Sequence, residues 1–280
     1  MTAAAGPGRA QVEEETHLSD RDFERVRARI YEIAGIVIEP QKRQMVHARL
    51  SRRLRAHKLA SFSEYLDRLD AAKDPSDIQD FVNAITTNLT SFFREVHHFE
   101  HLGANVLANV SKTSRMRIWS AGCSTGEEPY SVALVALSAP GGLPDDCKIL
   151  ATDLDTNVLE KAKAGAYAAD KAEGALAPYG RLFTKDADAG LIHIGEAARR
   201  LISFKQLNLL NTWPMRGHFD AIFCRNVLIY FNAETKARLV ARFAEQLKPG
   251  GYLYLGHSES ILGEHPLLEV DGLTTYRRRQ

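Results

Sequence analysis

The sequence predicts two domains: an all-helical N-terminal domain over residues 18–88 and a larger α/β domain built on a parallel sheet. In the first part, apolar residues recur at the three- and four-residue spacing of helices. After about Ser111, short β-rich runs alternate with helical stretches, the pattern of βαβ units. A glycine turn at Gly122–Gly126 joins the first β-rich run to a helix, as in Rossmann-like folds.

The composition is that of an ordinary globular protein with room for one large or two modest domains. Hydrophobic residues make up 45% of the 280 residues. The net charge of +1 argues against a nucleic-acid binder that relies on bulk charge, and no apolar run reaches the ~20 residues of a membrane span. Residues 1–17 lack the apolar stretch of a signal peptide and are expected to form a disordered tail. We therefore expect a cytoplasmic protein whose three scattered cysteines are free thiols.

The N-terminal domain is expected to contain four helices. Ser19 is the expected N-cap of the first, which should end near Gly35. A second helix should run from about Gln41 to Lys58. Two shorter helices follow, "SFSEYLDRLD" and "DPSDIQDFVNAITT", and the second opens with Asp74 as cap and Pro75 at the first helical position.

The α/β domain is expected over residues 111–280, after a linker over residues 89–110. Its strands should lie in the runs "RMRIWSA", "CKILATDLD", "LISFKQLNL", "FDAIFCRNVLIYF" and "GYLYLGHSE". The helices between them are expected at Pro129–Ala139, Thr156–Ala164 and Ala233–Leu247. Residues 178–202 interrupt the alternation and are expected to form a small β-subdomain. The chain should end in a β-hairpin that turns at Asp271-Gly272.

The glycine turn, "SAGCSTGEEPYS", predicts the class of ligand. The spacing of Gly122 and Gly126 matches neither the dinucleotide nor the P-loop pattern, and two glutamates at the helix start would repel phosphates. The next strand ends in Asp153, where an acidic residue can accept both ribose hydroxyls of an adenosine. S-adenosylmethionine has an adenosine, no phosphates and a cationic centre. The glutamates can also be first-turn partners of the helix dipole.

Two further phrases favour a Rossmann-like methyltransferase. "LKPGGYLYL" closes a helix with a Pro-Gly-Gly turn into a strand, as in many such enzymes. "FDAIFCRN" is a buried strand that ends in polar residues, where substrate should meet cofactor. These phrases, taken in order with the glycine turn and the acidic strand end, predict the methyltransferase class.

The segment between the domains, "TTNLTSFFREVHHFEHL", is too polar and aromatic for an idle linker. Asn88, Thr90 and Arg94 fall at spacings of two and four, so their side chains can converge on one face of a turn. An interdomain latch packed by the aromatic residues is the alternative. No carboxylate or cysteine cluster accompanies His97 and His98, so we expect no metal site.

Five motifs, in this order, resemble those of the CheR family of chemotaxis receptor glutamate methyltransferases: "TNLTSFFREVHHF", "SAGCSTGEEPYS", "ATDLDTNVLEKA", "FDAIFCRNVLIYF" and "GGYLYLGHSES". The resemblance covers the chain from about Leu18 to the C-terminus. It implies a helical domain joined to a Rossmann-like methyltransferase domain with a small β-subdomain. The implied reaction is S-adenosylmethionine-dependent methyl esterification of receptor glutamates in chemotactic adaptation.

The resemblance also implies the site. It places nine residues around S-adenosylmethionine: Asn88, Thr90, Arg94, Glu128, Asp153, Asn208, Leu209, Arg225 and Asn226. Arg94 and Tyr230 should lie closest to the transferred methyl group, although Tyr230 can also be a core tyrosine at a strand end. A glutamate with a pKa of ~4.3 is already ionised at neutral pH, so no general base is required. Arg94 would orient that carboxylate with its planar guanidinium.

The second helix, "QKRQMVHARLSRRLRAHK", carries seven Lys or Arg residues and no acid. A solvated face is the ordinary interpretation, but surface helices usually mix charges to form pairs along the helix. The resemblance names a partner, the methylation helices of a chemoreceptor, for which the expected contacts are Arg49, Arg52, Arg53 and Arg55. RNA is the competing partner. Some family members also hold a receptor tail peptide, here a candidate ligand of the β-subdomain.

Two alternatives to the receptor methyltransferase stay open. One is a methyltransferase that acts on RNA, another protein or a small molecule, although the chain lacks the Asn/Asp-Pro-Pro-Tyr motif of many amino-methylating enzymes after "FDAIFC". The other is a non-catalytic sensor or scaffold that binds the cofactor. Retention of Arg94, Asp153 and Tyr230 argues against loss of activity.

Overall fold

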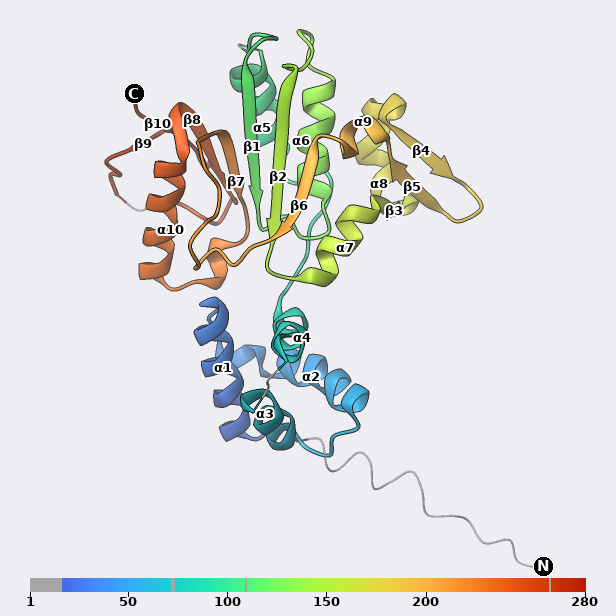
Figure 1. Ribbon diagram of the computed structural model, residues 1–280, viewed down its shortest axis with the longest axis vertical. Coiled ribbons are helices and arrows are strands. Elements are labelled where there is room, and N and C mark those ends of the chain that lie inside the picture. Colours follow the sequence, from blue (N-terminus) through green and yellow to red (C-terminus); the bar gives the residue numbers. More distant parts are fainter. Residues whose placement is uncertain (1–16, 72–73, 109, 262) are drawn as a thin grey trace, which may run out of the picture. The chain divides into compact units, whose positions relative to one another are not determined.

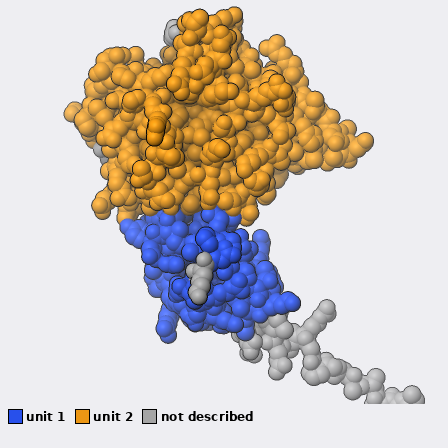
Figure 2. Space-filling view, in the orientation of Figure 1, with its two compact units in different colours: residues 1–86 blue, residues 87–280 orange. Residues whose placement is uncertain are grey.

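The structure is a computed structural model that describes residues 17–71, 74–108, 110–261 and 263–280. The chain divides into two compact units, residues 1–86 and 87–280 (Figure 2). The disordered tail expected at residues 1–17 lies, except for His17, outside the described residues. Each unit is described by itself below.

The first unit is helical, as the apolar spacing predicts. Its helices are α1 (Asp20–Ala34), η1 (Pro40–Lys42, a 3-10 turn), α2 (Arg43–His57), α3 (Phe62–Asp70) and α4 (Pro75–Ile85). The Ser19 hydroxyl accepts the Asp22 N–H at 3.0 Å, and Gly35 ends α1 with a φ of 67°, which glycine adopts without strain. Asp74 caps α4 through the Ser76 N–H at 2.9 Å. The expected caps are therefore confirmed.

The second unit is built on a seven-stranded sheet in the order β6-β2-β1-β7-β8-β10-β9 (Figure 1). The strands are β1 (Arg115–Ala121), β2 (Asp146–Asp153), β6 (Ile202–Gln206), β7 (Phe219–Cys224), β8 (Leu247–Leu255), β9 (Leu268–Val270) and β10 (Thr275–Arg278). The first five in this order pair in parallel, and the terminal hairpin β9–β10 adds two antiparallel strands. The chain leaves β1 toward β2 on one side and returns to β7 on the other, so the strand order switches at β1. Ligands bind at such a switch point in open α/β sheets.

The two faces of the sheet form two separate hydrophobic cores. Alternate residues point to opposite faces, so Ile118 and its neighbour Trp119 on β1 lie in different clusters. Helix α10 (Ala233–Gln246) packs on the Trp119 face, where Phe243 is fully buried. The Ile118 face is covered by α5 (His97–His101), η2 (Leu102–Leu107, a π-helix) and α6 (Glu127–Leu137). Helix α7 (Thr156–Ala164) follows β2 over the predicted residues.

The β-subdomain begins earlier than the sequence predicts. A second sheet, in the order β3-β5-β4, is made of β3 (Ala166–Ala168), β4 (Phe183–Asp186) and β5 (Leu191–Ile194), with α8 (Ala169–Leu176) and η3 (Ala177–Leu182) between β3 and β4. The predicted range 178–202 therefore misses β3, which is too short to show a periodic pattern. It also includes α9 (Glu196–Arg199) and the first residue of β6, which belongs to the main sheet.

The segment 89–110, for which the sequence predicts a linker, is part of the second unit. It carries α5 and η2, and it contributes Phe92, Phe99 and Leu102 to the core on the Ile118 face. The physical reason is its aromatic and aliphatic content, which is buried in the core of this unit.

Candidate active site

The glycine turn lies after β1, at the switch in strand order. The Gly122 and Cys123 N–H groups both donate to the Thr152 carbonyl at the end of β2, at 2.8 and 2.9 Å. Gly122 has a φ of 86°, and a Cβ there would meet Val227 Cγ2 at 2.3 Å. Gly126, with a φ of 96°, opens α6. Both glycines are thus required by the backbone that passes between the ends of β1, β2 and β7.

Asp153 ends β2 beside this turn. Its carboxylate accepts the Ser124 N–H at 2.8 Å on one oxygen and the Asp155 N–H at 2.9 Å on the other. Burial raises the pKa of Asp153 to about 6, and the two backbone donors work against that rise. Each oxygen retains acceptor capacity beyond its one N–H, which is the capacity that a ribose diol uses.

Asn88 lies next to Asp155, whose N–H binds the Asp153 carboxylate. Its amide donates to the Asp155 side chain at 2.7 Å, and its carbonyl accepts the Ser124 hydroxyl at 3.0 Å. Thr90, two residues further, is half-buried. On the other side, the Leu207 N–H donates to the Asp153 carbonyl at 2.9 Å, which brings the Asn208–Leu209 pair to the end of β2. The Asn208 side chain accepts the Leu210 N–H at 3.0 Å, and Leu209 is buried.

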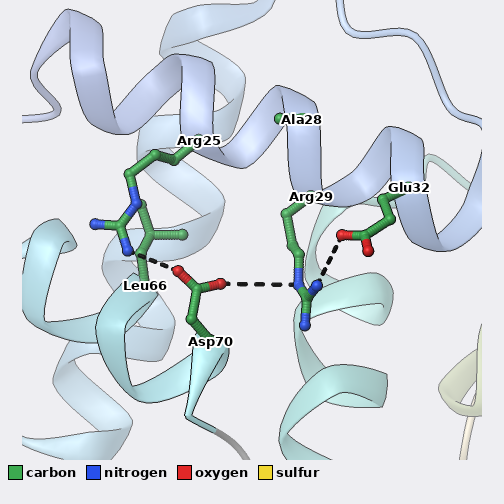
Figure 3. A pocket seen from close by; sticks show the side chains of 6 residues that line it. All are labelled: Arg25, Ala28, Arg29, Glu32, Leu66 and Asp70. Atoms are coloured by element: carbon green, nitrogen blue, oxygen red, sulfur yellow. Dashed lines mark hydrogen bonds and ion pairs between the residues drawn. The ribbon is translucent and has the colours of Figure 1, made fainter.

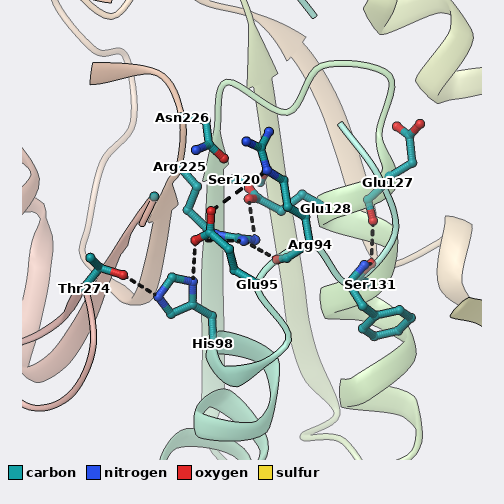
Figure 4. Close-up of polar contacts among 12 residues, drawn as sticks. Arg94, Glu95, His98, Ser120, Glu127, Glu128, Ser131, Arg225, Asn226 and Thr274 are labelled. Carbon is teal, nitrogen blue, oxygen red and sulfur yellow. Dashed lines mark hydrogen bonds and ion pairs between the residues drawn. The ribbon is translucent and has the colours of Figure 1, made fainter. Parts of the chain in front are cut away.

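Glu128 and Arg225 form a buried ion pair at the centre of the site (Figure 4). One Glu128 oxygen accepts the Ser120 hydroxyl at 2.7 Å, and the other lies 3.3 Å from Arg225 Nη1. Burial raises the pKa of the Glu128 carboxyl, against the opposing effect of Arg225. Arg225 also pairs with Glu95 at 3.3 Å and lies over the Phe99 ring at 5.4 Å. Its guanidinium is therefore held between two carboxylates and an aromatic ring.

Arg94 lies in a backbone segment of unusual geometry. Its neighbours Phe93 and Glu95 have φ values of 52° and 57°, in the left-handed region that bulky residues seldom adopt. The Phe93 N–H donates to the Ser131 hydroxyl at 3.0 Å, and the Arg225 guanidinium donates to the Arg94 carbonyl. The Arg94 side chain donates to the Leu89 carbonyl at 3.1 Å and is 32% exposed. Hydrogen bonds thus hold the main chain at the Phe93 N–H and at the Arg94 carbonyl, while the Arg94 side chain is partly exposed to solvent.

Strand β7 ends at Cys224, earlier than the predicted run "FDAIFCRNVLIYF". Asn226 takes a left-handed φ of 58°, which ends the ladder, and η4 (Leu228–Tyr230) follows as a single 3-10 turn. Tyr230 is only partly buried, and its hydroxyl donates to the Thr87 carbonyl at 3.4 Å. The alternative of a core tyrosine does not describe this position.

The basic helix α2 is less uniform than the sequence suggests. Arg49 donates to the Ile85 and Thr86 carbonyls at 2.6 and 2.8 Å, so it ties α2 to the end of α4. Arg53 pairs with Asp80 on α4. Arg52 and Arg55 are exposed. Of the four arginines expected to contact a receptor, Arg49 and Arg53 therefore hold the helical unit together, and Arg52 and Arg55 are the exposed ones.

A hollow of about 230 Å³ lies between α1 and α3 in the first unit (Figure 3). Its charged side chains pair with one another, Arg25 with Asp70 and Arg29 with Glu32, both at 2.8 Å. The hollow is thus lined by charged side chains of α1 and α3 that pair with one another.

Several residues of the site were not identified from the sequence. Glu95 pairs with Arg225, and the Glu95 carboxylate lies 3.2 Å from His257 Nδ1. His98 is fully buried, and burial lowers its pKa to about 3. Glu259 accepts three backbone N–H groups. The signal available was the charged and histidine residues that the motifs "FFREVHHF" and "GHSES" carry beside the expected strands and helices.

Within the described residues, no group of three His, Cys, Asp or Glu side chains is placed to hold a metal ion. The same residues include no helix that is long and apolar enough to cross a membrane. All three cysteines are buried free thiols.

The charge balance of the site fits a cationic ligand. The carboxylates are Glu95, Glu127, Glu128, Asp153 and Asp155, against the guanidiniums of Arg94 and Arg225. Asp153 suits the ribose of an adenosine, and the glycine turn admits a ligand close to the backbone. A parallel sheet with this turn after β1 and this acid after β2 defines the class of S-adenosylmethionine-dependent methyltransferases.

Comparison with known proteins gives the family. Residues 88–277 match the CheR methyltransferase S-adenosylmethionine-binding domain, and residues 21–86 match the CheR methyltransferase all-alpha domain. Chemotaxis protein methyltransferase 2 of Pseudomonas aeruginosa is 43% identical over 267 residues, which cover 94% of this chain and 95% of that protein. The chemotaxis protein methyltransferase of Escherichia coli is 41% identical over 271 residues, which cover 95% and 93%. The chain belongs to the CheR methyltransferase family, and S-adenosylmethionine is its cofactor.

Proposed function

We propose that this protein transfers a methyl group from S-adenosylmethionine to glutamate side chains of chemoreceptors. The relatives described above are named chemotaxis protein methyltransferases, which supports a role in chemotaxis. The choice of a carboxylate as acceptor rests on the chemistry of the site. The observation that carries it is the anchored, half-exposed guanidinium of Arg94 beside the Glu128–Arg225 pair.

The reaction needs little acid–base chemistry. A glutamate with a pKa of ~4.3 is ionised at neutral pH, so the nucleophile needs no deprotonation. The cofactor supplies an activated methyl on a sulfonium, and the displacement cancels a positive against a negative charge. The protein therefore contributes mainly alignment and removal of water from the carboxylate.

Arg94 has the properties of a positioning group for such a carboxylate. Its planar fork can hold a carboxylate by two parallel hydrogen bonds. Its backbone is held by Ser131 through Phe93 and by the Arg225 side chain, so the guanidinium projects from a fixed point. We assign the cofactor-binding role to Asn88, Thr90, Arg94, Glu128, Asp153, Asn208, Leu209, Arg225 and Asn226, and place Tyr230 beside the transferred methyl.

The receptor contacts belong to the same proposal. Arg52 and Arg55 are the exposed arginines among the four expected on α2, and they suit the acidic side chains of receptor methylation helices. Arg49 and Arg53 would support α2 from within the unit. The β-subdomain remains the proposed site for a receptor tail peptide. No observation on α2 favours RNA over an acidic helix.

The test is transfer of a radiolabelled methyl group from S-adenosylmethionine to membranes that contain a chemoreceptor. We expect label on the receptor that mild alkali releases as methanol, because carboxylate methyl esters hydrolyse in base. A receptor with glutamines at the methylation sites is the control and should take up little label. Label that withstands alkali, or label on RNA, would overturn the glutamate assignment.

A further inference from the structure

Glu259 is a buried carboxylate in the motif "GHSES", four residues after the end of β8. It is 5% exposed, and it accepts three backbone N–H groups: those of Asn226 at 2.7 Å, Gly256 at 2.7 Å and Ile229 at 3.0 Å. All three donors are backbone groups, so none of these hydrogen bonds comes from a cationic side chain. Backbone N–H groups therefore solvate this carboxylate.

The arrangement joins the ends of two neighbouring strands. Gly256 follows β8, whereas Asn226 and Ile229 follow β7, and one carboxylate binds to both loops. Hydrogen bonds to an ionised acceptor are about twice as strong as neutral ones. Removal of the acceptor would leave these backbone donors unsatisfied, and a buried donor without a partner is costly.

The bonds fix a segment that carries proposed site residues at both ends. Asn226 follows Arg225 directly and holds a left-handed φ of 58°. Ile229 immediately precedes Tyr230 in the 3-10 turn η4. The N–H groups that Glu259 binds thus belong to the residue after Arg225 and the residue before Tyr230. The carboxylate therefore constrains the length of main chain that separates these two side chains.

The close approach of the two loops is visible at Gly256 as well. A Cβ at this position would lie 2.6 Å from the Asn226 side-chain amide and 2.8 Å from both the Asn226 backbone nitrogen and a Glu259 oxygen. Only a residue without a side chain fits between the strand end and this carboxylate. Gly256 and Glu259 therefore both contribute to the contact between the loop after β7 and the loop after β8.

We propose that Glu259 is a positioning residue for methyl transfer: it binds the backbone of Asn226 and Ile229 and so holds Arg225 and Tyr230 in register with the cofactor. This inference rests on the site roles given under the proposed function. Glu259 itself is not one of the groups proposed to contact cofactor or substrate. It acts through the main chain with both carboxylate oxygens, of which a neutral amide side chain supplies only one.

The test compares Glu259→Gln with Glu264→Gln, a change at an exposed glutamate of the same loop. The amide keeps the shape but offers one acceptor oxygen, and its NH₂ faces a backbone donor. We expect kcat to fall ~10- to 100-fold in Glu259→Gln, while the Kd for S-adenosylhomocysteine changes by less than ~5-fold. Glu264→Gln should match the wild type. Wild-type kcat in a folded Glu259→Gln protein would overturn the proposal.

A double-mutant cycle separates positioning from general loss of stability. If Glu259 acts through the turn that carries Tyr230, the effects of Glu259→Gln and Tyr230→Phe on kcat should be strongly non-additive. Additive losses would contradict the proposal. Gly256→Ala serves as a second variant that disturbs the junction from the other side, and it too should lower kcat more than cofactor affinity. If the wild type forms no alkali-labile ester, the proposed function fails independently of these variants.

Discussion

The rings of Phe93 and Tyr179 stack face to face, with centroids 5.0 Å apart and planes only 6° from parallel. Phe93 immediately precedes Arg94, and Tyr179 lies in η3 of the β-subdomain. A second contact runs beside it: the Tyr167 hydroxyl of β3 donates to the Thr125 carbonyl of the glycine turn at 2.7 Å. The β-subdomain is therefore packed against both the Arg94 segment and the cofactor turn.

This stack predicts that the β-subdomain supports activity without any bound peptide. Tyr179→Ala removes a ring pair worth about 0.5–1.5 kcal/mol and loosens a segment already held in a left-handed conformation. We expect kcat to fall several-fold on a receptor that lacks its tail. Tyr179→Phe keeps the ring and should keep the rate. Equal rates for the alanine variant and the wild type would show that the stack is not needed.

Arg94 should be needed for turnover far more than for folding. Arg94→Ala removes a partly exposed guanidinium, so we expect unchanged thermal unfolding and a loss of at least ~100-fold in kcat/KM. Arg94→Lys keeps the charge but not the planar fork, and should recover only a small part of the rate. Full activity of the alanine variant in a single-turnover assay would remove Arg94 from the site.

Asp153 should make cofactor binding depend on pH. Its pKa is raised to about 6, so the free enzyme holds the proton below that pH and loses it above. Because the ionised form is the better acceptor for ribose hydroxyls, affinity should rise through about pH 6 and level off by about pH 8. Asp153→Asn should bind roughly tenfold more weakly at the higher pH. Calorimetric titration of both proteins across this range checks the slope, which should vanish in the variant.

The stability of the folded protein should depend on pH in the opposite direction to the cofactor affinity. The folded state binds the Asp153 proton more tightly than the unfolded chain, whose carboxyl titrates near 3.8. This group's contribution to stability is therefore lost as the pH rises through about 6. Cofactor should offset this loss, and the gain in melting temperature on adding S-adenosylhomocysteine should be larger above pH ~6 than below it.

Arg225 should be a determinant of stability. Arg225→Ala leaves the buried Glu128 without its cation and removes one partner of Glu95, and breaking a buried pair in this way costs about 3–5 kcal/mol. Arg238→Ala, at an exposed position on α10, is the matched control and should cost less than about 0.5 kcal/mol. Urea unfolding followed by far-ultraviolet circular dichroism measures both. A loss of under ~1 kcal/mol in Arg225→Ala would show that water solvates the carboxylates.

The arginines of α2 should separate into two groups. Reversal of the exposed pair, Arg52→Glu with Arg55→Glu, should raise KM for the receptor several-fold, leave cofactor affinity unchanged and reduce the salt dependence of binding. Arg49→Ala should instead lower the unfolding temperature, because Arg49 binds two carbonyls at the end of α4. An unchanged receptor KM in the reversed variant would exclude α2 as the docking helix.

The sequence predicts the elements of this fold well where local signals are strong. Ser19, Gly35 and Asp74 act as caps through short-range hydrogen bonds, and these depend on nearby residues alone. The alternation of β-rich runs and helical stretches is also a local signal, and it predicts the parallel sheet. Helix α7 has the predicted bounds because Asp155 caps one end and Gly165 takes the left-handed conformation at the other.

The remainder depends on contacts between residues far apart in sequence. Glu95 and Arg225 are 130 positions apart (225 − 95), and no local pattern predicts that they pair at 3.3 Å. The partners of Arg49 and Arg53 lie on a different helix, so the charge pattern of α2 alone does not reveal these contacts. The π-helix η2 likewise places Leu102, Val106 and Leu107 in the core on the sheet, and no local pattern predicts its π geometry. The assigned roles of the site residues stay a prediction until the variants above are measured.

The buried cysteines give the protein a chemical property of practical use. Burial raises the pKa of Cys147 to about 11, and those of Cys123 and Cys224 well above their usual value. Thiolates are the species that react with maleimides, so the native thiols should be almost inert to labelling at neutral pH. A cysteine introduced on the surface of the β-subdomain would then accept a fluorophore selectively. Conversely, the rate at which the native thiols become alkylated would report how often each sheet face opens.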